Sequence, residues 1–241
     1  MTLFRLGICP ARLERPRLTQ IRAFMEDPVT VDAYLLPEDY FAEAMLEELQ
    51  HIAKNAGKWI FAGMRGSDNH PYAVAIDGNG QLIHRHKKIA LPSYARAETA
   101  RTETREPGTT ISAFDTPWGR FGFLLCYELL FPEIARKGHK EGVKLFLNPI
   151  GEGGDLLHGM DIWSQMGRVR ALENNAHIAG VSHSHLANGV CYAANSGGDF
   201  YFNSEDRLHM TAVRFDMNFF PTSILENEYQ RVLTHIQQYI V

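Results

Sequence analysis

The stretch RFGFLLCYELLFPE, residues 120–133, indicates which type of fold this chain adopts. The apolar run up to Leu125 favours a buried β-strand, and Pro132 favours the first turn of a helix, where a missing N–H is tolerated. Cys126 is therefore expected at the bend between a strand and a helix. A side chain at such a bend is presented at the edge of a sheet, close to backbone N–H groups and to the positive end of a helix.

Outward from this bend, short apolar runs alternate with amphipathic stretches along the chain. Strand-like runs cover residues 3–9, 33–36, 59–63, 72–76, 81–86, 111–116, 120–125, 144–148, 176–182, 190–202 and 208–215. Helix-like stretches cover residues 16–25, 41–55, 132–140, 161–174 and 225–240. Turn residues at 77–80 and 117–119 predict two hairpins, and residues 89–108, which show no period, predict a long loop. This alternation indicates a layered α/β architecture.

The composition limits the classes of protein that the chain can represent. With 241 residues, 45% of them hydrophobic, one sizeable core is expected, and we predict a single domain over residues 1–241. The net charge of −4 and the lack of a basic block are atypical of a nucleic-acid binder. Cys9, Cys126 and Cys191 do not form a disulfide framework and fit a reducing compartment. No apolar run approaches about 18 residues, and Arg5 interrupts the N-terminal one, so we predict a cytoplasmic protein without a membrane segment.

Three side chains at the ends of predicted strands are candidates for chemistry. Cys126 is a candidate nucleophile, although a buried structural cysteine is a common alternative. Glu38 follows an apolar run, where partial desolvation favours a raised pKa and the role of a base; the alternative is an acid at a helix N-terminus beside Asp39. Lys88 can supply fixed positive charge to an oxyanion, or it can be a solvated lysine of an edge strand. Lys87 is expected on the opposite face.

Together these residues resemble the motifs of the nitrilase superfamily, in the expected order. The four matching stretches are LPE at 36–38, HKKIALP at 86–92, CYELLFPE at 126–133 and RVRALEN at 168–174. The resemblance spans roughly residues 3–215. It implies an α/β fold, specifically a four-layer αββα sandwich with two mixed β-sheets flanked by helices. One departure is Ala90, where the family usually has a histidine two places after its lysine.

The resemblance implies cysteine-dependent hydrolysis of a non-peptide carbon–nitrogen bond without a cofactor or metal. Cys126 would attack the substrate carbon, and Glu38 would take the thiol proton and later activate water. Lys88 and the backbone N–H of Tyr127 would stabilise the oxyanion on the way to an acyl-thioester. Glu98, with Glu103 as the alternative, would position the substrate and the lysine. The resemblance further implies a small-molecule amide or nitrile as substrate, an amide first, and a homodimer or larger homo-oligomer.

Rival interpretations remain open at this point. The pairs His84-x-His86 and His183-x-His185 have the spacing of metal ligands, but no further metal motif accompanies them. A soluble N-acyltransferase with the same triad is an alternative because its cysteine motif also reads Cys-Tyr-Glu, and a binding protein with a relic site is another. In the loop after residue 148, Glu152 or Asp155 favours a cationic substrate, unless these acids are simply solvated.

Overall fold

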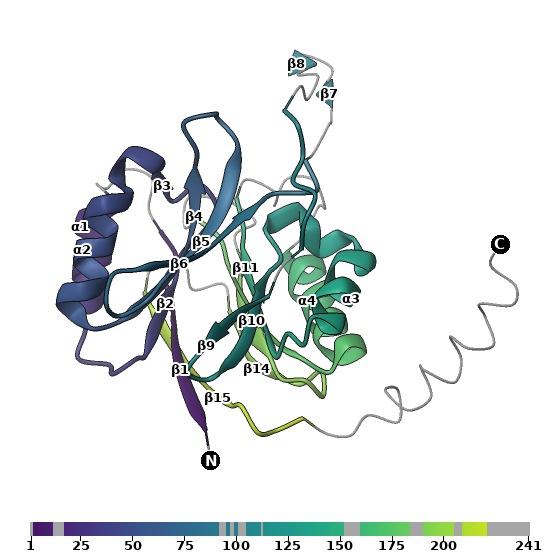
Figure 1. The fold of residues 1–241 in the computed structure, drawn as a ribbon. Coiled ribbons are helices and arrows are strands. Elements are labelled where there is room, and N and C mark those ends of the chain that lie inside the picture. Colours follow the sequence, from purple (N-terminus) through teal and green to yellow (C-terminus); the bar gives the residue numbers. More distant parts are fainter. Residues whose placement is uncertain are drawn as a thin grey trace, which may run out of the picture.

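Two mixed β-sheets pack face to face in the computed structural model of the chain, and helices cover the outer face of each sheet (Figure 1). The structure describes residues 2–11, 17–91, 95–96, 99–100, 105–111, 113–151, 160–183, 190–204 and 209–220. The first sheet has the order β15 (Thr211–Asp216), β1 (Leu3–Ile8), β2 (Ala33–Leu35), β4 (Trp59–Arg65), β5 (Pro71–Ile76) and β6 (Leu82–Lys87), with β3 (Phe41–Ala42) beside β4. The second has the order β14 (Phe200–Ser204), β13 (Cys191–Ala194), β12 (His177–Val181), β11 (Leu145–Pro149), β10 (Gly119–Phe123) and β9 (Phe114–Thr116).

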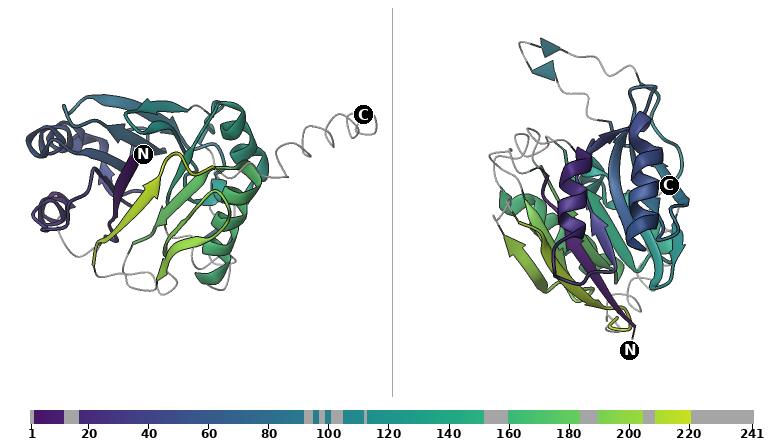
Figure 2. Two further views of the ribbon diagram at one scale, coloured as in Figure 1. Left: turned by 90° about the horizontal axis from the view of Figure 1, so that it is seen from below. Right: turned by 90° about the vertical axis from the view of Figure 1, so that its left-hand side faces the viewer.

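The helices form the two outer layers, as the three views agree (Figures 1 and 2). Helices α1 (Arg17–Met25) and α2 (Leu46–Ala56) cover the first sheet, and α3 (Pro132–Lys140) and α4 (Met160–Asn174) cover the second. Short 3₁₀ helices, η1 (Glu43–Met45) and η2 (Cys126–Leu130), precede α2 and α3. A small pair of strands, β7 (Ala95–Arg96) and β8 (Thr99–Ala100), lies apart from both sheets.

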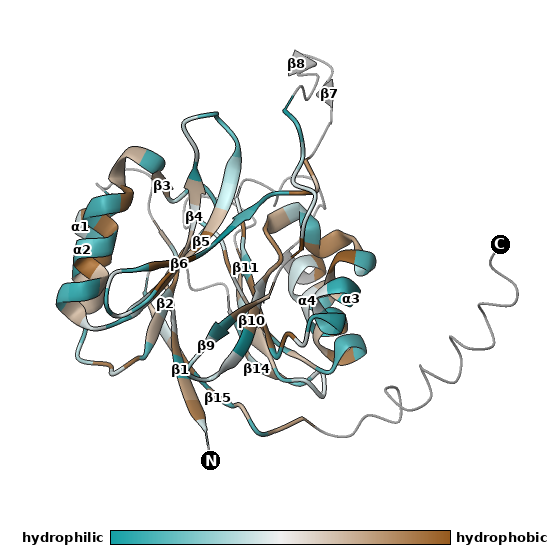
Figure 3. Cartoon of the chain, in the orientation of Figure 1, coloured by the Kyte–Doolittle hydropathy of each residue, from teal (hydrophilic) through white to brown (hydrophobic). Residues whose placement is uncertain are grey.

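Three apolar clusters separate these four layers. The middle cluster lies between the sheets and is rich in aromatic side chains, among them Phe4, Phe61, Phe121, Phe123 and Phe215. The outer clusters lie between each sheet and its helices, and Figure 3 shows the alternation of polar and apolar residues around α2 that such one-sided burial requires. The four-layer αββα sandwich predicted from the sequence is confirmed.

The central strands of both sheets are parallel, which brings several strand ends to one region. β1, β2 and β4 run parallel in the first sheet, and β10, β11 and β12 run parallel in the second. β6 runs in the direction of β4 because two antiparallel pairings reverse the chain twice. The segments that follow β2, β6, β10 and β11 carry Glu38, Lys88, Cys126 and Gly151.

Two sequence predictions about local structure are wrong. Residues 190–202 form β13 and β14 rather than one strand, because the Asn195 side chain accepts hydrogen bonds from the N–H groups of Gly197 and Asp199 and closes a turn. Residues 41–55 do not form one helix, since β3 pairs with β4 before η1 and α2 begin. The predicted loop over 89–108 contains β7 and β8, and the predicted helix over 225–240 lies outside the described residues.

Candidate active site

Glu38 lies in a segment that leaves β2 and crosses over β4. Gly63 of β4 donates its N–H to the carbonyl of Pro37 and accepts the N–H of Tyr40, both at 3.0 Å. A Cβ at Gly63 would overlap the Cα of Glu38, so only glycine allows this close crossing. The crossing leaves the Glu38 side chain only 7% exposed. The next residue, Asp39, has a φ of 53° and forms an ion pair with Arg65.

Lys88 directly follows β6 and reaches the carboxylate of Glu38. Its Nζ donates to Glu38 Oε1 at 2.6 Å, and the lysine side chain is only 4% exposed. Its carbonyl accepts hydrogen bonds from the N–H of Gly108 at 2.9 Å and from His70 Nε2 at 3.0 Å. Burial acts to lower the pKa of Lys88, but the nearby Glu38 and Cys126 outweigh this effect and hold that pKa above its usual value. Lys88 is thus a fixed ammonium.

Cys126 is the first residue of η2, at the bend that the sequence predicted. Its φ of 50° is unusual for a residue with a side chain, as is common for a nucleophile at a sharp turn after a strand. The residue is 4% exposed. Burial and the negative charge of Glu38 raise the pKa of its thiol to about 12, although Lys88 and a hydrogen bond from the N–H of Gly151 act in the opposite direction. In this environment Cys126 is therefore a neutral thiol.

Gly151 follows β11 and packs against the end of the Glu38 side chain. A Cβ at this position would overlap Glu38 Oε2. The same residue directs its N–H to Cys126, so its backbone touches two candidate residues at once. The sequence predicts that this loop contacts the substrate but does not mark Gly151, for which the available signal is a glycine next to a strand end.

His183 and His86, proposed above as members of metal-ligand pairs, have other partners. His183 follows β12, and its Nε2 lies 2.6 Å from the carbonyl oxygen of Glu38. His86 faces the carboxylate of Glu128, a buried contact that sequence analysis missed. His84 stacks on Phe114 with ring centroids 4.9 Å apart. Within the described ranges, no group of three or more His, Cys, Asp or Glu residues is arranged to hold a metal ion.

The remaining candidates differ in how much can be said of them. Tyr127 is partly exposed in the first turn of η2, where backbone N–H groups lack an acceptor within the helix. Its N–H is therefore a suitable oxyanion donor by position. The other candidate acids lie outside the described residues: Glu98, Glu103, Glu152 and Asp155. The same is true of His185.

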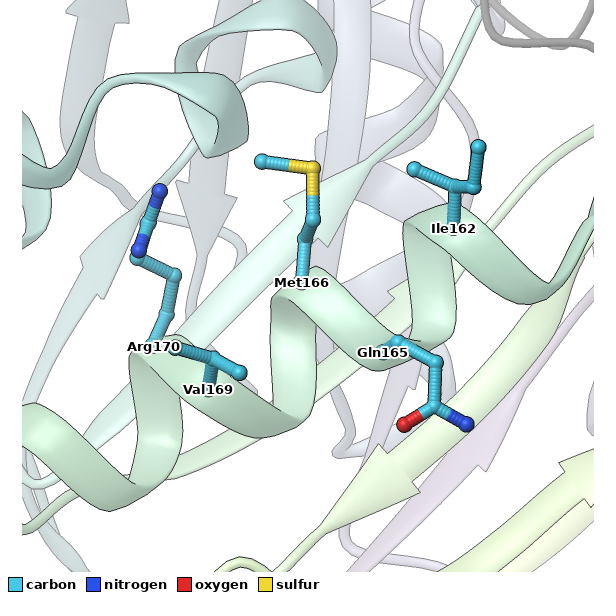
Figure 4. A pocket seen from close by; sticks show the side chains of 5 residues that line it. All are labelled: Ile162, Gln165, Met166, Val169 and Arg170. Carbon is cyan, nitrogen blue, oxygen red and sulfur yellow. The ribbon is translucent and has the colours of Figure 1, made fainter.

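Helix α4 contacts the short helix η2, which begins at Cys126, through a residue of its 168–174 motif. Arg170 donates through Nε to the carbonyl of Leu129 in η2 at 3.0 Å and pairs with Glu173 at 3.0 Å. A groove of about 410 Å³ lies on this helix beside Arg170 (Figure 4). Its lining residues are Ile162, Gln165, Met166, Val169 and Arg170. None of these five residues is a sequence candidate for chemistry. The hydrogen bond from Arg170 to Leu129 gives the motif in α4 a structural role, because it ties α4 to the short helix that begins at Cys126.

Comparisons with known proteins show what this chain is similar to. The sequence profile of the carbon–nitrogen hydrolase family matches residues 29–204. An omega-amidase from Xenopus tropicalis is 28% identical over 145 residues, which are 56% of this chain and 51% of that protein. The chain thus matches about half the length of this relative. Among the helices that the structure describes, none is long and apolar enough to cross a membrane.

Solved structures share the fold at low sequence identity. The NitFhit protein of Caenorhabditis elegans has a TM-score of 0.77 at 20% identity, covering 97% of this chain and 64% of that one. A variant of an amidase from Nesterenkonia sp. has a TM-score of 0.74 at 18% identity, covering 95% of this chain and 96% of that one. That variant carries the acetamide moiety of fluoroacetamide, added covalently at its active-site cysteine.

Proposed function

Because the chain belongs to the carbon–nitrogen hydrolase family, we propose that it hydrolyses the carbon–nitrogen bond of a small-molecule amide through a thioester on Cys126. The observation that carries this proposal is the buried contact of 2.6 Å between Lys88 Nζ and Glu38 Oε1, next to the Cys126 thiol. A base, a fixed positive charge and a nucleophile thus meet in one place. The segments that bring them together come from both sheets.

In the first half-reaction, the neutral thiol requires that attack and proton transfer occur together. Glu38 takes the proton from Cys126 as Sγ bonds to the carbonyl carbon, and the carbonyl oxygen becomes an oxyanion. The Lys88 ammonium and the N–H of Tyr127 stabilise this charge. Glu38 then gives its proton to the nitrogen, the carbon–nitrogen bond breaks, and ammonia or an amine leaves behind a thioester.

In the second half-reaction, water takes the place of the departed amine. Glu38 takes a proton from the water as its oxygen bonds to the thioester carbon, and Lys88 again faces the oxyanion. The carbon–sulfur bond then breaks, and the proton held by Glu38 returns to the sulfur of Cys126. The carboxylic acid is released, and the thiol, carboxylate and ammonium of the resting site are restored.

Amide hydrolysis is favoured over nitrile hydrolysis and acyl transfer by the relatives. The protein from Xenopus tropicalis is an omega-amidase, and the Nesterenkonia structure is an amidase with an adduct on a cysteine. A terminal amide is therefore the first class of compound to test. We expect mass spectrometry to detect an acyl adduct on Cys126 after incubation with a panel of amides and nitriles.

The Cys126→Ala variant provides the direct test of the nucleophile. We expect it to lose amide hydrolysis while its circular dichroism spectrum and unfolding transition stay close to those of the wild type. Cys191→Ala is a matched control, because Cys191 is also buried but lies in β13. Hydrolysis by Cys126→Ala at the wild-type rate would overturn the proposal.

A homodimer or larger assembly, which the family resemblance implies, is part of the proposal. Exposed apolar side chains on α4, Ile162, Val169 and Leu172, offer a surface for such contact. We expect analytical ultracentrifugation to give a mass above 27.3 kDa for the purified protein. Val169→Glu is expected to shift this equilibrium toward the monomer, because a carboxylate would be desolvated in the contact.

A further inference from the structure

We propose that Glu128 and His86 are positioning residues. They hold the backbone segment beside Lys88 and the backbone segment beside Cys126 at a fixed separation. This inference rests on the function proposed above, since it assigns a role in that reaction. Glu128 is the third residue of η2 and is fully buried. Neither residue touches the carbonyl that Cys126 would attack in the proposed mechanism, so both act through other residues.

The carboxylate of Glu128 joins the two segments through their backbones. Its Oε1 accepts the N–H of Ile89 at 2.6 Å, and Ile89 directly follows Lys88. Its Oε2 accepts the N–H of Leu125 at 2.7 Å, and Leu125 directly precedes Cys126. One side chain therefore restrains the immediate neighbours of both the ammonium and the nucleophile.

His86 completes this arrangement from the first sheet. Its Nε2 lies 3.0 Å from Oε1 and 2.9 Å from Oε2 of Glu128, and both side chains are buried. Burial acts to raise the pKa of Glu128, but His86 and the two backbone N–H groups hold it below its usual value. The carboxylate therefore stays ionised, and an ionised acceptor makes shorter and stronger hydrogen bonds than a neutral one.

The position of this contact between the sheets explains why it matters for chemistry. His86 lies in β6 of the first sheet, whereas Leu125 and Glu128 lie at the end of β10 and in η2, on the second. The apolar cluster between the sheets favours their contact but is not directional. Directional hydrogen bonds to Glu128 set where Lys88 stands relative to Cys126. Glu128 also adds negative charge near Lys88, which favours its ammonium form.

Glu128→Gln keeps the shape of the side chain and tests the inference. An amide group must point its NH₂ at one of the two backbone N–H groups, so one hydrogen bond is lost and the segments move apart. We expect kcat to fall about 100-fold, as for a misplacement of about 1 Å, and KM to stay within about threefold. The alkylation of Cys126 by iodoacetamide should need a higher pH, because the Lys88 ammonium no longer favours the thiolate as strongly.

His177→Gln is the matched control for a purely structural effect. Like His86, His177 is buried and hydrogen-bonded, here to the carbonyl of Asp216. It begins β12, whereas His183, which contacts Glu38, follows the other end of that strand, so His177 lies away from the candidate site. We expect this variant to lose stability with little change in kcat or in the pH profile of alkylation. A Glu128→Gln variant whose kcat and alkylation profile match those of His177→Gln would overturn the inference.

Two further variants keep the test decisive. If Glu128→Gln does not fold, His86→Phe removes one donor and leaves both backbone hydrogen bonds, so we expect about a tenfold loss of kcat in a folded protein. His86→Gln restores an N–H donor and should recover part of that loss. Wild-type kcat in His86→Phe would overturn the role of His86. Active Cys126→Ala would instead refute the proposed function, so the two failures are distinguishable.

Discussion

The two sheets make different contributions to the candidate site. The first sheet supplies its charged groups, since Glu38 follows β2 and Lys88 follows β6. The second supplies the thiol and a backbone donor, since Cys126 follows β10 and Gly151 follows β11. Of the residues proposed for catalysis, the nucleophile and the base therefore follow strands of different sheets. The reaction proposed here therefore depends on how one sheet is placed on the other, and not only on which residues are present.

The largest effect is expected when the first sheet loses its base. Glu38→Gln should lower kcat by about 10³-fold, because the buried thiol then has no carboxylate to accept its proton during attack. Alkylation of Cys126 at neutral pH should slow as well. Steady-state kinetics and an iodoacetamide time course measure the two effects. Asp39→Asn, one residue away, is the control; an unchanged alkylation rate in Glu38→Gln would exclude Glu38 as the base.

Gly151 and Gly63 contact different parts of Glu38, so substitutions at them distinguish an effect on catalysis from an effect on folding. Gly151→Ala adds a methyl group against the end of the Glu38 side chain, which can swing away. We expect about a 100-fold loss of kcat and less than about 1 kcal/mol of lost stability, since only the carboxylate moves. Gly63→Ala pushes against the backbone of Pro37 and Glu38, so we expect about 3 kcal/mol of lost stability.

Urea unfolding and kcat at one temperature distinguish these two glycine variants. We expect Gly151→Ala to keep its stability and to have a low kcat, whereas Gly63→Ala is expected to be unstable. If Gly151→Ala were as active as the wild type, the reaction would not depend on the position of the Glu38 carboxylate in this structure. If both variants lost only stability, the two sides of Glu38 would not differ in function.

Local patterns in the sequence predicted much of the fold but only part of the candidate site. Pro132 and the period that follows predicted α3 over the residues it occupies, and the bend at Cys126 followed from an apolar run next to a helix start. The run over 190–202 failed because its turn depends on the Asn195 side chain. The hydrophobic period of a helix or strand indicates which of its faces is buried. It does not indicate which residues pack against that face.

The parts of the site that sequence analysis missed depend on contacts between distant segments. Glu128 meets His86 across 42 positions, and His183 meets the carbonyl of Glu38 across 145. Their local sequence does not indicate these contacts. His86 and His183, for example, belong to pairs with the spacing of metal ligands. Gly151 and Gly63 are likewise understood only once Glu38 is seen against them. Such roles arise from packing, which is absent from any short window of sequence.

The smallest predicted effect concerns the contact between the sheets itself. The ring of His84 in β6 stacks on Phe114 of the second sheet, and burial, with a smaller effect of His86, lowers the pKa of His84 to about 4. An unfolded histidine titrates near 6.5, so its contribution to stability is complete above that pH and is lost as the pH falls toward 4. His84→Phe keeps the ring contact but cannot titrate.

We therefore expect the stability lost between pH 7 and pH 4.5 to be smaller in His84→Phe by about 1–2 kcal/mol, measured by urea unfolding at both pH values. Burial also lowers the pKa of His177 in the second sheet to about 4. Since His177 is not substituted in this variant, its contribution to the pH dependence of stability remains. An identical loss in variant and wild type would remove His84 as a source of acid sensitivity. Since the ring contact is kept, kcat at pH 7 should not change; a fall in kcat would show that packing at His84 also sets the placement of the sheets on which Lys88 and Cys126 depend.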